Sequence, residues 1–96
     1  MAARWSVYIV RCRDGALYTG IAIDVRRRLA QHAGDRNGGA KYLRGKSPLR
    51  LEMARVVGSR GLAQSVEHRI KRLTRARKLA LVAKRSLLAR LIAEVR

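Results

Sequence analysis

The sequence predicts an α/β fold, in which a small mixed or antiparallel sheet of three strands is flanked by helices. Three β-rich runs indicate the sheet, at residues 6–12, 16–23 and 49–57. Asp14-Gly15 separates the first two runs and is a strong hairpin signal. Segments with helical periodicity follow the second and third runs. A chain of 96 residues is long enough for one domain with one small core.

The hairpin loop decides where two tyrosines point. A two-residue loop would place Tyr8 and Tyr18 on opposite faces of the sheet, because side chains alternate along a strand. A three-residue loop with Gly15 in the left-handed region would pair Cys12 with Ala16 and place both phenols on one face. We predict the three-residue loop, and therefore a shared face.

A first helix is predicted directly after the hairpin. Asp24 is a suitable N-cap, because its carboxylate can accept the free amide hydrogens of the first turn, and Gly34 is a suitable end. The predicted buried stripe consists of Val25, Leu29 and Ala33. Arg28 and His32 are four residues apart and lie together beside that stripe. Arg28 is open to two interpretations, an exposed ion pair with Asp24 or a clamp for a phosphate.

A second helix is predicted over residues 62–73, after a turn at Gly58–Gly61. Its apolar stripe consists of Leu62, Val66, Ile70 and Leu73. Glu67 borders the stripe, where a carboxylate needs a partner. That partner is either Lys71 at i+4 or a divalent cation. His68 points about 100° away from Glu67 around the helix, and we interpret it as an ordinary surface residue.

Glu67 is also the carboxylate that remains when the six acidic residues are considered as metal ligands in turn. The other five have other predicted places: Asp14 in the turn, Asp24 at the cap, Asp35 in a glycine-rich loop, Glu52 on the polar face of its strand and Glu94 near the C-terminal end.

The C-terminal third predicts two further helices, with Thr74 and Ser86 as N-caps. Their apolar face is expected to cover the sheet. A helix lying on a membrane surface and a dimer contact are the alternatives for this segment.

Charge points to a polyanionic partner. The net charge is +17, and nucleic acid is the commonest polyanion for a basic domain of this size. Residues 34–48 form a basic, glycine-rich loop that includes Lys41, Arg44 and Lys46, and Lys71 and Arg72 extend the basic set on the second helix. These five residues are the candidate nucleic-acid contacts, with DNA as the expected partner.

Cys12 is the single cysteine, so it can form no intramolecular disulfide, and a buried thiol in a reducing cytoplasm is expected. The sequence contains neither a signal-peptide apolar run nor a membrane span, so no membrane partner is expected.

Together these residues resemble the GIY-YIG nuclease family, in particular its small stand-alone bacterial branch, over about residues 5–80, with residues 81–96 as a helical extension. Tyr8 in Ser6-Val7-Tyr8 matches the first signature tyrosine, and Tyr18 with Gly20 matches the second signature. Arg28 and His32 match the spacing on the family's first helix. Glu67, before Ile70-Lys71, matches the family's metal-binding glutamate. Thr19, in place of isoleucine, departs from the signature, as does Ser6-Val7 in place of Gly-Ile.

The resemblance implies a mainly antiparallel three-stranded sheet and an endonuclease that hydrolyses phosphodiester bonds in DNA. It implies one Mg²⁺ or Mn²⁺ ion held by Glu67, and Arg28 as the group that stabilises charge on the phosphorus. Tyr8, Tyr18 and His32 are the candidates to help deprotonate the attacking water. Tyr8 is the preferred base or water-positioning group, although an ordinary tyrosine pKa near 10 requires nearby positive charge to lower it.

A non-catalytic nucleic-acid-binding protein on a degenerate nuclease fold is the alternative. The Gly-x-x-Gly of residues 58–61 follows a strand, whereas KH domains place this loop between helices. RRM and OB folds bind through several exposed aromatic residues, and this chain has three tyrosines, one tryptophan and no phenylalanine. A homodimer or a recruiting protein is left open.

Overall fold

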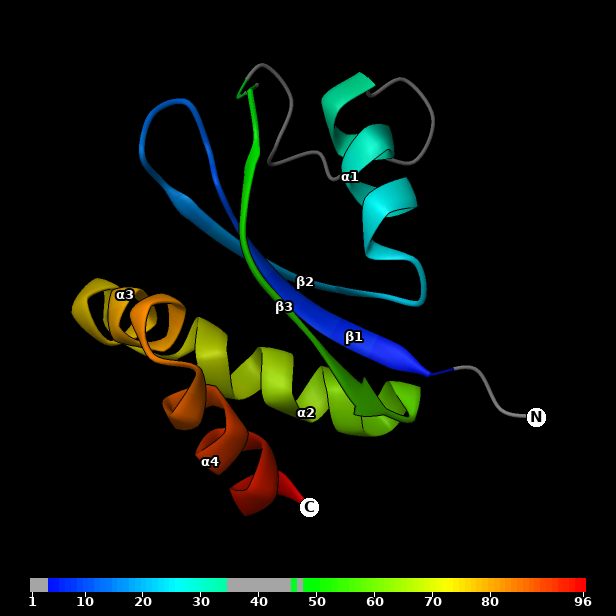
Figure 1. The fold of residues 1–96 in the computed structure, drawn as a ribbon, viewed down its shortest axis with the longest axis vertical. Coiled ribbons are helices and arrows are strands. Elements are labelled where there is room, and N and C mark those ends of the chain that lie inside the picture. Colours follow the sequence, from blue (N-terminus) through cyan, green and yellow to red (C-terminus); the bar gives the residue numbers. More distant parts are fainter. Residues whose placement is uncertain (1–3, 35–45, 47) are drawn as a thin grey trace.

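A computed structural model describes residues 4–34, 46 and 48–96. The elements follow the order β1 (Trp5–Arg11), β2 (Leu17–Ala22), α1 (Val25–Gly34), β3 (Arg50–Gly58), α2 (Arg60–Lys71), α3 (Arg75–Ala83) and α4 (Arg85–Val95). The three strands form one sheet with the order β2-β1-β3, and β1 pairs antiparallel with both neighbours (Figure 1). The predicted α/β fold with a three-stranded antiparallel sheet is confirmed.

The hairpin has the predicted three-residue loop. Cys12 N donates to Ala16 O at 2.8 Å, and Gly15 has a φ of 88°, in the left-handed region that favours glycine. In this register Tyr8 lies opposite Gly20, and Val10 lies opposite Tyr18. The two tyrosines therefore share one face of the sheet.

The main core lies between the sheet and the helices α2, α3 and α4. Val7 and Ile9 of β1 are fully buried against it. The helices contribute Ala63, Val66, Ile70, Leu81, Leu88, Leu91 and Ile92. The prediction that the C-terminal apolar face covers the sheet is confirmed. The alternating side chains Val10 and Cys12 belong to a second, smaller cluster that includes Leu29 of α1, so α1 packs on the other face (Figure 1).

The helix starts follow local capping chemistry at three sites. Asp24 Oδ1 accepts from Arg27 N at 3.1 Å, and Thr74 Oγ1 accepts from Arg77 N at 3.2 Å, as predicted. Ser59 caps α2, which therefore begins two residues before the predicted start. The prediction of Ser86 as an N-cap was wrong. The chain leaves α3 in extended conformation at Lys84, and α4 begins at once with no side-chain cap bond.

The third strand contains a bulge. Its register with β1 shifts between Ile9 and Val10, which pair with Met53 and Leu51, so Glu52 lies at a bulge. The Glu52 side chain is only 12% exposed and pairs with Arg11 Nε at 3.1 Å, whereas Leu51 is 43% exposed. Glu52, which was predicted on the polar face of its strand, pairs with two arginines, Arg11 and Arg50.

Within the part of the chain that the structure describes, no helix is both long and apolar enough to cross a membrane.

Candidate active site

Tyr8 and Tyr18 meet on the face of the sheet that carries α1. Their ring centroids are 6.5 Å apart and the rings are inclined at 45°. Tyr8 is 1% exposed, and Tyr18 is half-buried. The hairpin register accounts for this pair, because it sets the two residues on adjacent strands one step apart along the same face. Tyr18 is therefore the phenol of this pair that solvent or a substrate can reach.

Arg28 brings a cation to the buried phenol. It lies half-buried on the first turns of α1, and its guanidinium hydrogen-bonds the Tyr8 side chain. Its Nη1 also donates to Gln31 Oε1 at 3.1 Å. Asp24, the other partner considered for Arg28, uses its carboxylate to cap α1. The guanidinium is thus oriented from two sides and lies beside the tyrosine pair.

Burial decides the protonation of Tyr8. The pKa of Tyr8 is raised to about 12, mainly because burial desolvates the phenol; the negative charges of an ionised Tyr18 and of Glu67 also raise it, and Arg28 acts in the opposite direction. The expected lowering by Arg28 is present but is outweighed by burial. At neutral pH Tyr8 is therefore a neutral hydroxyl, which disfavours it as a general base and suits it to orienting Arg28.

Gly20 makes room for the Tyr8 ring. A Cβ built on Gly20 would overlap the Tyr8 hydroxyl and lie 2.6 Å from Tyr8 Cζ, closer than real Cβ contacts. The absence of a side chain at this position is therefore what lets the phenol lie across β2.

Glu67 and Lys71 lie on α2 next to the tyrosines. Glu67 is close enough to influence the pKa of Tyr8, and its side chain is 21% exposed. Its Oε2 is 3.2 Å from Lys71 Nζ, so the i+4 ion pair considered for Glu67 is present. Lys71 Nζ lies 5.9 Å from the centre of the Tyr18 ring. The carboxylate thus faces the site with a lysine beside it.

The donor set around Glu67 fits one kind of metal ion. Among the described residues, His, Cys, Asp and Glu form no group of three or more that could hold a metal. One carboxylate with phenol oxygens nearby is an all-oxygen set, which suits a hard cation such as Mg²⁺ or Mn²⁺ that keeps most of its waters. Such an ion would have to compete with Lys71 for the carboxylate.

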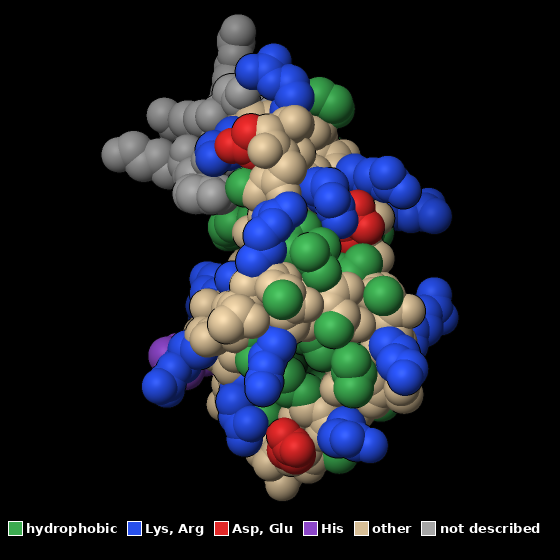
Figure 2. Space-filling model, turned by 90° about the vertical axis from the view of Figure 1, so that its left-hand side faces the viewer, with side chains coloured by type: hydrophobic (Ala, Val, Ile, Leu, Met, Phe, Trp, Pro, Cys, Tyr) green, Lys and Arg blue, Asp and Glu red, His purple; other side chains and the backbone are tan. Residues whose placement is uncertain are grey.

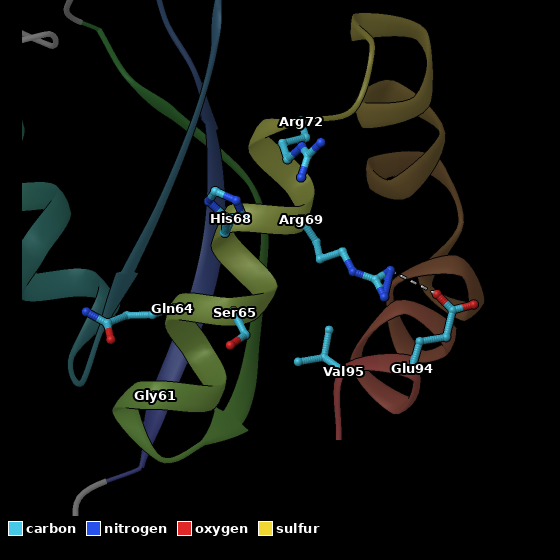
Figure 3. Close-up of a pocket in the computed structure, with 8 residues that line it drawn as sticks. All are labelled: Gly61, Gln64, Ser65, His68, Arg69, Arg72, Glu94 and Val95. Atoms are coloured by element: carbon cyan, nitrogen blue, oxygen red, sulfur yellow. Dashed lines mark hydrogen bonds and ion pairs between the residues drawn. The ribbon is translucent and has the colours of Figure 1, made fainter.

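The protein carries many basic side chains, in keeping with its net charge of +17. Figure 2 shows one face of the molecule, on which Lys and Arg side chains surround a group of apolar ones and acidic side chains are few. A groove of about 560 Å³ crosses the outer sides of α2 and α4 (Figure 3). Its side chains from α2 are Gln64, Ser65, His68 and Arg69, and Arg72 at the C-cap of this helix lines it as well. Arg69 Nη1 lies 3.5 Å from Glu94 Oε1 at its edge.

The predicted nucleic-acid contacts are distributed unevenly. Arg72 lies in the groove, and His68, interpreted as an ordinary surface residue, lines it as well. Lys71 is exposed on the same helix. Lys46 lies at the hairpin, where its Nζ is 3.1 Å from Asp14 Oδ2. Lys41, Arg44 and the side chain of His32 lie outside the described residues.

Sequence reasoning missed Gln31, which is one turn from Arg28 and accepts its hydrogen bond. The i+3 spacing was the available signal.

Comparisons with known proteins identify the family of this chain. The GIY-YIG catalytic domain family matches residues 4–80. A UPF0213 protein of Cronobacter sakazakii is 52% identical over 79 residues, covering 82% of this chain and 81% of that protein. UPF0213 protein YhbQ of Escherichia coli O1:K1 is 44% identical over 91 residues, covering 95% of this chain and 89% of that protein.

A solved structure is similar as well. The solution structure of a UPF0213 protein from Bacillus halodurans has a TM-score of 0.54 and 40% sequence identity, and it covers 83% of each chain. The residues matched by the family, 4–80, include both tyrosines, Gly20, Arg28 and Glu67, and the fold is similar to that of this solved structure. The chain belongs to the GIY-YIG family, a family of nucleases, and its relatives are the small bacterial UPF0213 proteins.

Proposed function

We propose that this protein is a divalent-metal-dependent endonuclease that hydrolyses phosphodiester bonds in DNA. The observation that carries the proposal is the hydrogen bond between the Arg28 guanidinium and the buried Tyr8 phenol, formed within the electrostatic reach of Glu67 and Tyr18. A guanidinium held in this way presents fixed positive charge, which is what a phosphoryl group needs as negative charge develops on it.

Each residue has a role that follows from its surroundings. Arg28 would bind the scissile phosphate and stabilise its added charge, and Tyr8 would hold Arg28 in place. Tyr18 is half-buried and so would contact the attacking water or the substrate. His32, whose side chain lies outside the described residues, is proposed from its residue type to accept a proton, because imidazole side chains as a class titrate near neutral pH. Glu67 would hold Mg²⁺ or Mn²⁺, which when bound supplies positive charge to the phosphate and to the leaving oxygen.

The basic surface supports a nucleic-acid substrate. With a net charge of +17, affinity for duplex DNA would come mainly from phosphate neutralisation and would fall steeply with salt. Structure-selective cleavage, a cytoplasmic location, and action as a homodimer or with a recruiting protein remain predictions of the same kind.

A magnesium-dependent nicking assay tests the proposal. Duplex, flapped and branched DNA would be incubated with the wild-type chain, with Glu67→Gln and with Glu94→Gln. Glu94 is the matched control, because it is also a helical glutamate paired with a basic residue but lies away from the tyrosines. We expect cleavage by the wild type and by Glu94→Gln only with the divalent ion, and a loss of at least 100-fold in Glu67→Gln with DNA affinity retained. Equal activity of Glu67→Gln and the wild type would refute the assignment of Glu67.

A binding-only protein is the second candidate, and the Glu67–Lys71 ion pair at 3.2 Å is the observation that favours it. In that case Glu67 serves to stabilise α2, and no ion is bound. The same assay separates the two, because a binding-only protein retards DNA in a gel and leaves both strands intact with either Mg²⁺ or Mn²⁺.

A further inference from the structure

A second hollow lies at the edge of the sheet, next to the candidate active site. It has a volume of about 540 Å³, within the usual range of small-molecule pockets. Its lining residues come from the start of β1, the end of β2 and the first turns of α1 and α2. Figure 1 shows where these elements lie. Its walls are apolar on the sheet side, with Trp5, Ile21, Ala22 and Ile23, and polar on the helix side, with Asp24, Arg27, Arg28, Gln31 and Arg60.

The residues that line this hollow carry more positive than negative charge. Three arginines face one carboxylate, that of Asp24, and this carboxylate already accepts the Arg27 backbone amide as the cap of α1. Arg27 and Arg60 are exposed. A site with several guanidinium groups and so little acid is suited to a phosphate-bearing ligand.

The apolar wall indicates that the ligand also has an apolar surface. Ile23 is 55% exposed, among the largest exposures of an apolar side chain in the described structure. Trp5 is half-buried, and the Arg60 guanidinium carbon lies 5.4 Å from its ring centre. Flat aromatic and guanidinium surfaces beside an exposed isoleucine form the kind of wall on which a nucleobase packs.

Arg28 connects the two sites. It hydrogen-bonds Tyr8 in the candidate active site and also lines the hollow, together with its partner Gln31. A strand whose phosphate is bound at Arg28 therefore continues into the hollow with its neighbouring nucleotide. We propose that this hollow binds one unpaired nucleotide of a DNA strand, with its base against Trp5 and Ile23 and its phosphate on Arg27 and Arg60. The inference rests on the proposed function, because it takes the phosphate bound at Arg28 to be the scissile phosphate.

The base must be unpaired, because a base inside a duplex is covered on both faces by its neighbours and cannot lie against a side chain without leaving the stack. The hollow would therefore select single-stranded ends or flaps over intact duplex, and would place the cut beside the unpaired nucleotide.

Trp5 provides a readout that does not require cleavage, because it is the only tryptophan of the chain. The full chain would be titrated in EDTA with a single strand, a blunt duplex and a duplex with a single-stranded flap. Tryptophan emission would be followed together with the anisotropy of a label on the DNA. We expect the single strand and the flap to change Trp5 emission, and the blunt duplex to bind without changing it.

Matched variants identify the contacts. Ile23→Ala should weaken binding of the single strand and the flap about tenfold while duplex affinity changes less than twofold, because base packing is lost but phosphate contacts remain. Val56→Ala is the control for a truncated exposed residue, since Val56 is 47% exposed on β3, and it should leave all three affinities unchanged. Arg75→Ala removes an exposed arginine elsewhere and should weaken all three DNAs to the same degree.

Two results would overturn the inference: Trp5 emission that responds to no DNA with unpaired bases, or an Ile23→Ala variant that loses affinity equally for all three DNAs. Cleavage is measured separately in Mg²⁺. A protein that cuts DNA but shows either result retains its proposed function and loses the nucleotide site. A protein that shows the selective emission change but cuts nothing retains the nucleotide site and loses the endonuclease assignment.

Discussion

Gly20 lies directly beneath the Tyr8 hydroxyl, and the two residues face each other across the β1–β2 register. An added Cβ would overlap the phenol, which cannot withdraw because Tyr8 is 1% exposed. The glycine is thus required by close packing, since its φ is not in the left-handed region. The contact between Gly20 and Tyr8 therefore links the hairpin register to the position of the Tyr8 ring, and through that ring to the Arg28 guanidinium.

Gly20→Ala is expected to displace the Tyr8 ring, to lower the free energy of unfolding by about 1–3 kcal/mol through overpacking, and to reduce nicking at least tenfold. Urea denaturation and the nicking assay measure the two effects. Gly61→Ala is the control. A Cβ added at Gly61 meets no atom within 4 Å, and Gly61 lies in α2, where alanine favours the helix. If Gly20→Ala behaved like Gly61→Ala, the contact with Tyr8 would have no structural importance.

Tyr8→Phe removes the hydroxyl and keeps the ring. Because burial raises the pKa of Tyr8 to about 12, above its ordinary value near 10, the folded protein keeps this proton where the unfolded chain loses it. Stability from this group is therefore complete below about pH 10 and falls as pH rises toward 12, by up to roughly 2–3 kcal/mol. The wild type should lose stability over that interval faster than Tyr8→Phe.

Denaturation curves at several pH values between 9 and 12 measure this difference, and subtracting one protein from the other removes the contribution of the remaining lysines and tyrosines. Parallel pH profiles would contradict the raised pKa. At neutral pH, Tyr8→Phe should reduce nicking, because Arg28 loses one of the two groups that orient it.

The sequence was most informative where local chemistry alone decides the structure. Asp14-Gly15 determined the hairpin, and the loop length then determined that Tyr8 and Tyr18 share a face. The β3 bulge at Glu52 had no such signal, because it arises from pairing with a strand about 40 residues away, and neither had the ion pair between Glu52 and Arg11.

In the candidate site, too, the sequence predicted some features and could not predict others. The helical spacing correctly suggested Lys71 as one partner of Glu67, and the pair is present. Spacing could not reveal that Tyr8 is almost wholly buried, because burial depends on how α1 and the sheet pack together. The consequence is chemical, since burial raises the pKa of Tyr8 and shifts its expected role from base to support for Arg28.

Arg28→Lys keeps the charge but loses the planar fork that serves Tyr8 and Gln31 and that we propose also binds a phosphate. We expect a fall in kcat of about 100-fold with DNA affinity reduced less than threefold, because one charge remains in place. Arg26→Lys is the matched control, an exposed neighbour on the same helix, and should retain wild-type nicking. Equal kcat values for the two variants would show that Arg28 acts only as a point charge.

Replacing Lys71 is expected to have opposite effects on metal binding and on DNA binding. Its Nζ is 3.2 Å from Glu67 Oε2, and it is also a candidate phosphate contact. Lys71→Met should lower the Mg²⁺ concentration that gives half-maximal nicking, because the ion no longer competes with an ammonium for the carboxylate. The same variant should bind duplex DNA more weakly, and the slope of log K against log salt should become shallower by about 0.9, one phosphate contact.

Lys84→Met is the control for Lys71→Met, as Lys84 is exposed between α3 and α4 and away from Glu67. It should leave the Mg²⁺ dependence unchanged. Nicking rates over a Mg²⁺ titration and filter binding over a salt titration separate the two effects. An unchanged Mg²⁺ requirement in Lys71→Met would mean that the ion and Lys71 do not share the carboxylate, and would remove Glu67 from the proposed metal site even if the variant still cut DNA.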